Sequence, residues 1–271
     1  MRQFIKDIEM AGKVFIRYCY FSLYRAIFGK DDSRLALGES IHAYKFPRWN
    51  LLDVKDSDIN LNLEKHPYSI SLSNVQFCYS SHMFEHISDS AVKYLLEQVF
   101  LSMRDGGIIR VEVPSSDKIL EDYRADSGRP IAKYFSQSNV DTIVNIDGFP
   151  DKYGELHIGT LGAISCIHTD LGNKIYQHIP VYVGVDEFEQ KLNNLSNDDF
   201  SRWAINLQTE AERSQHGHIN FWTESKMKEF LENAGFCEVQ TCDPGISEHG
   251  FDLSIEREHR AFYSIIMEAK R

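Results

Sequence analysis

The stretch from residue 75 to residue 114 constrains the fold most, because it reads as strand, helix, turn and strand in direct succession. VQFCYSS (75–81) is an apolar run of strand length, and DSAVKYLLEQVFLSM (89–103) places its apolar residues on one helical face. The turn RDGG (104–107) leads into IIRVEVP (108–114), which is rich in β-branched residues and ends at proline. Such a βαβ unit builds a parallel sheet with right-handed crossovers. The sequence therefore predicts an α/β fold.

Further elements on both sides extend this unit. RLALG (34–38) and RWNLLDV (48–54) read as two earlier strands. TESKMKEFLENAG (223–235) reads as a helix that begins at the N-cap Thr223 and ends at Gly235, and 236–243 and 261–270 read as two final strands. We expect these segments and the βαβ unit to form one doubly wound domain over residues 32–271.

Residues 116–215 fit the alternation of strands and helices poorly. A block of this length is more often an inserted subdomain than a loop. It leaves the domain after Pro114, at the carboxyl end of a strand, and ligands of open parallel sheets bind beyond such ends. We therefore expect the insertion to cover the site and to shape the pocket of a second substrate.

The N-terminus differs in charge from the rest of the chain. Residues 1–30 carry six basic and two acidic side chains together with seven aromatic ones, and their apolar residues recur at helical spacing. We predict a basic amphipathic helix over residues 1–31. It packs on the main domain or on a second subunit, or it lies on an anionic membrane surface; both alternatives stay open.

Composition excludes some classes of function. The whole chain carries 40 acidic and 29 basic side chains, a net charge of −11, which argues against a nucleic-acid binder held by phosphate contacts. The five cysteines form no C-x-x-C pair, which is typical of a reduced, cytoplasmic protein. Localisation is thus predicted as cytoplasmic, with peripheral attachment to the inner membrane as the variant that the N-terminal helix would allow.

Three segments together resemble the class I S-adenosylmethionine-dependent methyltransferase family. CYSSHMFEHISDSAVKYLLEQVFLSMRDGGIIRVEVPS (78–115) is similar to the family's central strand, helix, GG turn and next strand, and WTESKMKEFLENAGF (222–236) is similar to its closing helix. RLALGES followed by WNLLDV resembles a type 11-like branch common near bacterial polysaccharide-assembly genes. The resemblance covers about 34–115 and 216–270. It implies a Rossmann-like doubly wound, mostly parallel sheet with an antiparallel last strand, and S-adenosylmethionine as the cofactor.

The resemblance places a cofactor site at the ends of the first strands. Gly38 would let the methionine part of the cofactor approach the backbone, and Asp53 would accept hydrogen bonds from the ribose hydroxyls. Asp53 comes 15 residues after Gly38, which leaves room only for a stunted helix, in agreement with Pro47. The cofactor-binding residues predicted in this way are Gly38, Glu39, Asp53, Asp58, Ile59, Ser80 and Ser81, of which Asp58 and Ile59 would flank the adenine and the two serines the sulfonium.

Removing a proton from a hydroxyl acceptor suits a base with a pKa near neutrality, so histidines are considered first. His82, His218 and Asp117 are the catalytic candidates in that order, with His157, His168 and His216 as further histidines in the second half of the chain. The run H-x-x-E-H at residues 82–86 resembles an inverted zincin motif, but it lies at a strand-to-helix turn and not within a long helix. We therefore expect no metal.

Two functions from different classes follow. The first is S-adenosylmethionine-dependent methyl transfer to a small-molecule or glycan-type acceptor, such as a sugar hydroxyl in surface polysaccharide biosynthesis. The second is a non-catalytic protein with the methyltransferase fold that has lost cofactor binding and acts as a partner or scaffold subunit. Glu39 and Ser40 motivate the second, because they stand where the family's further glycines are expected.

Overall fold

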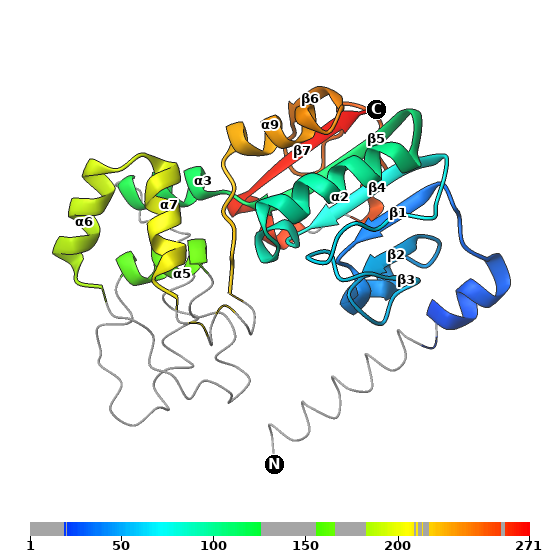
Figure 1. The fold of residues 1–271 in the computed structure, drawn as a ribbon, viewed down its shortest axis with the longest axis horizontal. Coiled ribbons are helices and arrows are strands. Elements are labelled where there is room, and N and C mark those ends of the chain that lie inside the picture. The colour runs from blue at the N-terminus through cyan, green and yellow to red at the C-terminus, as the bar shows by residue number, and fades with distance from the viewer. Residues whose placement is uncertain are drawn as a thin grey trace, which may run out of the picture.

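The computed structural model describes residues 21–125, 156–165, 183–208, 217–255 and 258–271, together with Cys19, Glu210 and Arg213. One seven-stranded sheet with the strand order β3-β2-β1-β4-β5-β7-β6 forms its centre (Figure 1). The parallel strands are β1 (Arg34–Leu37), β2 (Asn50–Asp53), β3 (Ile59–Asn60), β4 (Val75–Ser81) and β5 (Met103–Pro114). The last strand, β7 (Ser264–Lys270), runs antiparallel between β5 and β6 (Cys237–Thr241). The predicted Rossmann-like, mostly parallel sheet is thereby confirmed.

Both faces of the sheet are buried because the strand side chains alternate between two apolar clusters. Leu35 and Leu37 of β1 pack in a cluster with residues of α2 (Asp89–Ser102) and α9 (Glu224–Asn233), which cover one face. Ala36, between them in the sequence, packs on the other face with Tyr79 of β4. That face is covered by the 3₁₀ helix η1 (Ser40–Lys45) and by the loop before β7.

Local signals in the sequence set most element ends. The side chain of Thr223 accepts a hydrogen bond from the amide of Lys226 and so caps α9, and Gly235 ends that helix with a φ of 106°. The expected stunted helix after β1 is η1, a 3₁₀ helix. One prediction was wrong: residues 104–107 are not a separate turn, since β5 begins at Met103, which pairs with Val75, and the extended chain bends at Gly106, where φ is 72°.

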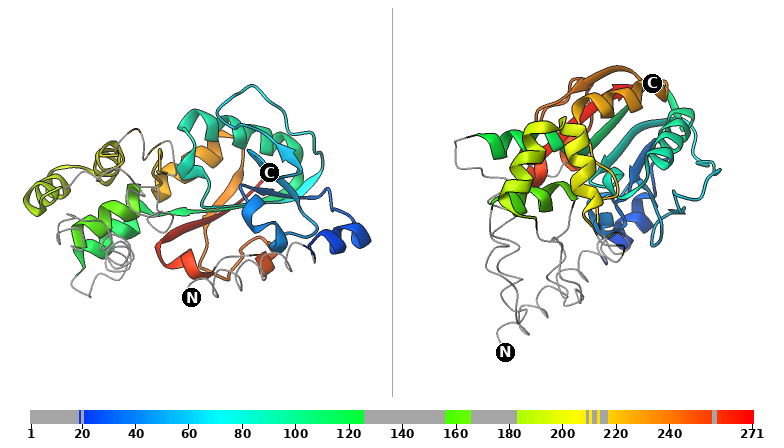
Figure 2. Two further views of the ribbon diagram at one scale, coloured as in Figure 1. Left: turned by 90° about the horizontal axis from the view of Figure 1, so that it is seen from below. Right: turned by 60° about the vertical axis from the view of Figure 1, so that its left-hand side comes forward.

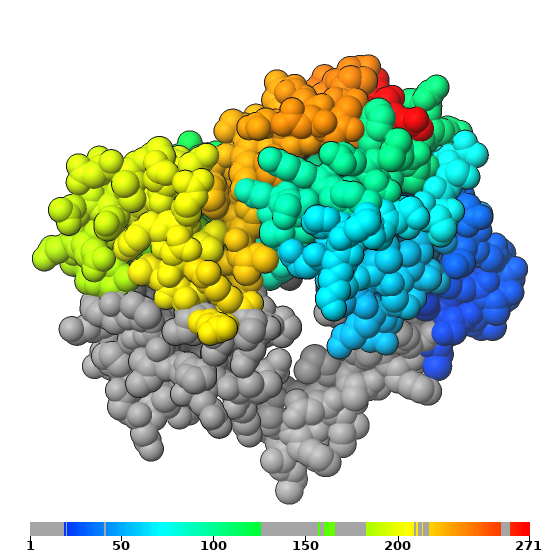
Figure 3. Space-filling model, viewed as in Figure 1, coloured from blue at the N-terminus to red at the C-terminus, as the bar shows by residue number. Residues whose placement is uncertain are grey.

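The chain leaves the sheet after β5 and forms a helical lobe beyond the end of that strand (Figures 1 and 2). The described helices of the lobe are α3 (Ser116–Arg124), α5 (Leu156–Ser165), α6 (Val185–Asn194) and α7 (Asn197–Asn206). They share an apolar core of their own around Leu120, Phe188 and Phe200, apart from the two clusters of the sheet. Figure 3 shows the surface of α6 and α7 beside that of the sheet domain. These helices fall within the range 116–215 in which an inserted subdomain is predicted.

A helix over residues 21–28 lies against the sheet domain at the end of the described N-terminal part. Arg25 forms an ion pair with Asp58, with an Nη1–Oδ1 distance of 2.7 Å, and it also donates to the carbonyls of Pro47 and Trp49. The rest of the predicted helix, residues 1–18 and 20, lies outside the described residues. Among the described helices, none combines the length and the apolar character that crossing a bilayer would need.

Candidate functional site

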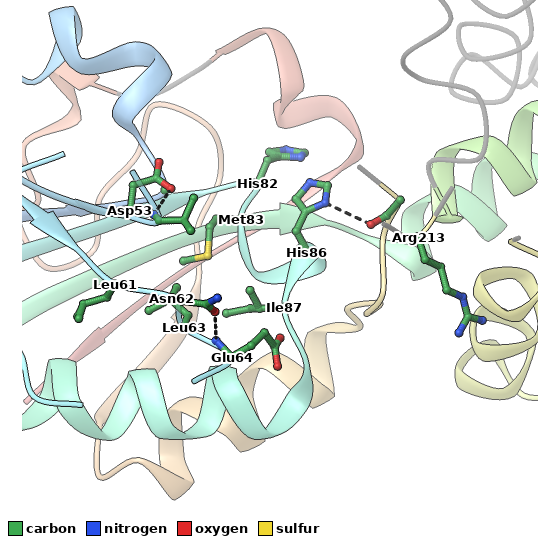
Figure 4. Close-up of a pocket in the computed structure, with 13 residues that line it drawn as sticks. Asp53, Leu61, Asn62, Leu63, Glu64, His82, Met83, His86, Ile87 and Arg213 are labelled. Atoms are coloured by element: carbon green, nitrogen blue, oxygen red, sulfur yellow. Dashed lines mark hydrogen bonds between the residues drawn. The ribbon is translucent and has the colours of Figure 1, made fainter. Parts of the chain in front are cut away.

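A pocket of about 480 Å³ lies at the carboxyl ends of the first four strands (Figure 4). Gly38 follows β1, Asp53 ends β2, residues 61–64 follow β3, and His82 and Met83 follow β4. These ends converge because the strands are parallel and in register: Leu37 pairs with both Leu52 and Ser80. The volume is within the range of small-molecule sites, about 300–1,000 Å³. The pocket thus opens at the edge of the sheet where ligands of such folds bind.

Two features require a glycine at position 38: its backbone conformation and the close contact with the side chain of Met83. Its φ is 71°, a left-handed value that residues with a Cβ rarely adopt. A Cβ on Gly38 would collide with Cγ of Met83 and lie 2.8 Å from Cβ of Met83. The space that the glycine leaves is therefore occupied by an unbranched, adaptable side chain that itself lines the pocket.

Asp53 fixes the loop after β1 to the end of β2. Its Oδ2 accepts hydrogen bonds from the amide of Ser40 (3.2 Å) and from the hydroxyl of Ser40 (2.7 Å), and its Oδ1 accepts one from the amide of Val54 (2.6 Å). The carboxylate is half-buried and lines the pocket. Oδ1 keeps one lone pair beyond these bonds, and at Oδ2 a ligand hydroxyl can take the place of the Ser40 hydroxyl while the amide of Ser40 still holds the carboxylate. An oriented carboxylate of this kind can accept hydrogen bonds from a pair of hydroxyls.

His82 lines the pocket and lies at the centre of a buried polar network. Its Nδ1 is 3.3 Å from Oε1 of Glu85, its Nε2 is 2.9 Å from the hydroxyl of Ser264, and its side chain is 5% exposed. Because a carboxylate only accepts, Nδ1 carries the proton, and Nε2 accepts from Ser264. Glu112 is 3.9 Å from Nε2 and accepts a hydrogen bond from Ser81. The φ of His82 is 51°, a strained value that the surrounding contacts hold in place.

Glu85, His86 and His218 form a second group beside His82. Burial alone would raise the pKa of Glu85, but the hydrogen bond from His82 and the charges of the three neighbouring histidines lower it to about 2. Burial, followed by the neighbouring His86, lowers the pKa of His218 to about 4, so that its ring is neutral near pH 7. The ring centroids of His86 and His218 are 5.1 Å apart, edge to face. The group thus combines a charged carboxylate with a neutral imidazole.

Of the predicted cofactor residues, the structure brings Gly38 and Asp53 together in the pocket, and five lie outside its lining. Asp58 pairs with Arg25, and although burial works against it, that partner and the amide of Leu51 lower the pKa of Asp58. Ile59 packs against the core, and Glu39 is fully buried. The hydroxyl of Ser81 donates to Glu112, and that of Ser80 is buried with no hydrogen-bond partner in the described part of the chain.

The structure separates the predicted catalytic residues. His82 lines the pocket, whereas His218 is 8% exposed and lies one residue beyond the lining residue Gly217. Asp117 lies in α3 and accepts from the side chain of Asn197 and from the amide of Glu224, away from the pocket. His157 is buried in the lobe, with its Nε2 2.9 Å from the carbonyl of Val183. His168 and His216 lie outside the described residues.

Sequence reasoning missed several lining residues. Met83 and Ile87 follow β4, and residues 61–64 (Leu-Asn-Leu-Glu) follow β3. Glu64 accepts hydrogen bonds from the amide and the hydroxyl of Ser88, the N-cap of α2, and so ties this loop to the helix. The sequence signal for these residues was the alternation of apolar and polar side chains over residues 61–64. Because this segment directly follows the end of a parallel strand, it lies at the same edge of the sheet as Gly38 and Asp53.

The sequence matches no protein-family model and no curated protein. Solved structures similar to the chain include the S-adenosylmethionine-dependent methyltransferase SibL (10% identity, TM-score 0.35, covering 88% of this chain and 49% of that one). Human N-acetylserotonin methyltransferase in complex with S-adenosylmethionine is 11% identical, with a TM-score of 0.35, and the match covers 88% of this chain and 47% of that one. An S-adenosylmethionine-dependent methyltransferase from Mesorhizobium loti is 12% identical, with a TM-score of 0.39, and the match covers 92% of this chain and 96% of that one. The chain thus spans about half the length of the first two. The strand order of the sheet itself shows the fold class.

Proposed function

We propose that this chain transfers a methyl group from S-adenosylmethionine to a small-molecule or glycan-type acceptor. The observation that carries the proposal is that Gly38 and Asp53, at the ends of two adjacent parallel strands, line one pocket of suitable size. Asp53 would accept hydrogen bonds from the ribose hydroxyls, with its orientation fixed by Ser40. S-adenosylmethionine supplies, when bound, a methyl group activated by a positive sulfur. The chain's residues fit such a ligand where Met83 can move from its place over Gly38.

His82 is the base in this proposal. It lines the pocket, and the contact from its Nδ1 to Glu85 holds the ring with Nε2 as the proton acceptor. To take a proton from an acceptor hydroxyl, Nε2 must exchange its present partner, the hydroxyl of Ser264, for that hydroxyl. Arg213 at the pocket favours an acceptor that carries a negative charge or many hydroxyls, as a glycan does. The resemblance suggests a sugar hydroxyl as the acceptor and a role in surface polysaccharide biosynthesis.

Calorimetric titration with S-adenosylmethionine and S-adenosylhomocysteine tests the proposal. We expect both to bind, and Asp53→Ala to weaken binding at least tenfold, because two charge-assisted hydrogen bonds to a ligand are lost, each worth about 1.5–3 kcal/mol. Asp105→Asn is the matched control, since this exposed carboxyl lies near the start of β5, at the opposite end of the sheet. The absence of binding heat at millimolar ligand would reject methyl transfer.

The alternative, a partner or scaffold subunit that has lost cofactor binding, is favoured by a different observation. Met83 lies where a ligand contacting the backbone of Gly38 would lie. Glu39 and Ser40, which motivated this alternative, do not line the pocket. Met83→Ala separates the two functions: if Met83 closes the crevice, only this variant binds S-adenosylhomocysteine, whereas an enzyme binds it with and without the substitution.

For residues 1–30, the proposal is contact with a membrane surface or with a second subunit, in a protein that otherwise stays in the cytoplasm. Three apolar side chains of the described helix are more than half exposed: Leu23, Ile27 and Phe28. Sedimentation of the full chain with phosphatidylserine vesicles at low salt, against neutral vesicles, tests the membrane contact. A chain that stays in the supernatant with both would reject it, and light scattering would then measure self-association.

A further inference from the structure

The side chains of Glu85, His86 and His218 bring potential ligand atoms within 4.8 Å of one another beside the pocket, and of the three only Glu85, which orients the ring of His82, has a role in the methyl transfer proposed above. We propose that these three residues bind a divalent transition-metal ion of the zinc type. Two imidazoles and one carboxylate are a donor set that zinc uses in catalytic sites, where a further coordination position stays open to water or substrate. This inference does not depend on methyl transfer.

Both histidines are oriented as metal ligands usually are. Nδ1 of His218 is 2.8 Å from the carbonyl of Ile164, and Nδ1 of His86 is 3.4 Å from the carbonyl of Gly217 (Figure 4). A backbone carbonyl only accepts hydrogen bonds, so in the neutral rings the proton is on Nδ1 and the lone pair is on Nε2. Ligating histidines typically use their other ring nitrogen in this way, which fixes both the tautomer and the ring. No hydrogen bond to Nε2 of either ring is found among the described residues.

Glu85 supplies an independent observation. Its side chain is 2% exposed; Oε1 is 3.3 Å from Nδ1 of His82 and 3.9 Å from Nε2 of His86. Its other oxygen, Oε2, is buried and has no hydrogen-bond partner within the described ranges. A buried carboxylate oxygen normally has a partner, because withdrawing it from water is unfavourable. A cation held between Glu85 and the two histidines would supply that partner.

The backbone holds the three ligands in place before any ion binds. The carbonyl of Glu85 accepts hydrogen bonds from the amides of Ile219 (2.9 Å) and Asn220 (3.1 Å), and the amide of His218 donates to the carbonyl of Ser165 (3.1 Å). The segment that carries His218 is thereby fastened both to α5 and to η2 (Phe84–His86). Tetrahedral ligands of zinc are separated by about 3.4 Å, given bonds of about 2.1 Å, so small side-chain rotations complete the site.

The ion would be reachable from the pocket. The side chain of His86 is 39% exposed and lines the pocket, whereas Glu85 and His218 lie behind it. An oxygen of a molecule in the pocket could therefore occupy the open coordination position, where a zinc-type ion lowers the pKa of a bound hydroxyl or water.

Titration of the chelator-treated full chain with Co²⁺ tests the proposal. We expect one equivalent of Co²⁺ with visible absorption bands of four- or five-coordinate cobalt, displaced by one equivalent of Zn²⁺. Substituting a residue that only hydrogen-bonds to a metal ligand lowers metal affinity by about 10–100-fold, so His86→Gln, which removes a ligand itself, should weaken Co²⁺ binding by more than that. His66→Gln is the matched control, because His66 stacks on Tyr94 and takes no part in the cluster.

Zinc X-ray absorption on the wild-type chain gives a readout that needs no variant. Two imidazole ligands and at least one oxygen are expected. Fewer than two imidazoles, or Co²⁺ binding that His86→Gln leaves unchanged, would overturn the proposal, as would the absence of stoichiometric Co²⁺ at millimolar concentration. Because these measurements follow ion binding alone, methyl transfer can fail while the metal site stands, and the reverse also holds.

Discussion

The contact between Gly38 and Met83 leads to a prediction on stability, for which a second glycine of the chain serves as the control. Gly38 and Gly106 have nearly equal φ values, 71° and 72°, so that alanine suffers the same backbone strain at either position. The two glycines differ in their surroundings: a Cβ at Gly106 would have nothing within 4 Å, whereas a Cβ at Gly38 would meet Met83. Comparing Gly38→Ala with Gly106→Ala therefore isolates the cost of the close packing.

The magnitude follows from these two terms. A left-handed backbone costs a residue with a Cβ about 1–2 kcal/mol, and this is the whole effect expected for Gly106→Ala. At Gly38 the rotation of a side chain relieves only part of the collision, since Cβ of Met83, at 2.8 Å, is attached to the backbone. Overpacking adds about 1–3 kcal/mol. Gly38→Ala should thus lower the free energy of unfolding by about 2–5 kcal/mol, a large part of the ~5–15 kcal/mol of a typical domain.

Urea unfolding followed by circular dichroism measures both variants, and equal slopes against denaturant would show that only stability changes. Met83→Ala in the background of Gly38→Ala removes Cγ, so the double variant should lose less stability than the sum of the single ones, with a coupling of about 0.5–3 kcal/mol. If Gly38→Ala and Gly106→Ala are equally destabilised, or if the cycle is additive, the reasoning about the packing of Met83 is refuted.

Three further predictions follow from other contacts. The lowered pKa of Asp58 means that its ion pair with Arg25 stabilises the fold above the unfolded pKa of about 3.9 and that this stabilisation is lost as the pH falls through the folded pKa. The protection factors of the amides in residues 21–28, which correct for the pH dependence of intrinsic hydrogen exchange, should therefore fall as the pH is lowered below about 3.9, and Asp58→Asn should show low protection already at pH 7. Glu268→Gln leaves the charge of Arg110 buried and should cost about 3–5 kcal/mol in urea unfolding, with a smaller loss when both are replaced by methionine. Thr223→Ala removes the cap of α9 and should cost about 1 kcal/mol, whereas Thr223→Ser, which keeps the hydroxyl, should cost little.

The sequence by itself determined which segments form strands and helices around the sheet. Periodicity and end signals act over a few residues, so the cap at Thr223 and the stop at Gly235 could be assigned locally. The meeting of Gly38 and Asp53 was also predictable, because the carboxyl ends of parallel strands in register meet at one edge. There were three exceptions. Pairing with β4 extends the strand before residue 108 back to Met103, β3 was not predicted as a strand, and residues 261–263 belong to a 3₁₀ helix and not to the last strand.

Only the tertiary structure decided which partners the polar side chains meet. Asp58 was expected to flank the adenine, but the side chain of Arg25, 33 residues earlier, binds its carboxylate. From the sequence, His218 was only one of several candidate catalytic histidines. In the structure, backbone hydrogen bonds from residues 219 and 220 to the carbonyl of Glu85 place His218 beside His86. The physical reason is that propensity and periodicity are short-range, whereas an ion pair or a ligand set depends on which distant segment packs against the sheet end.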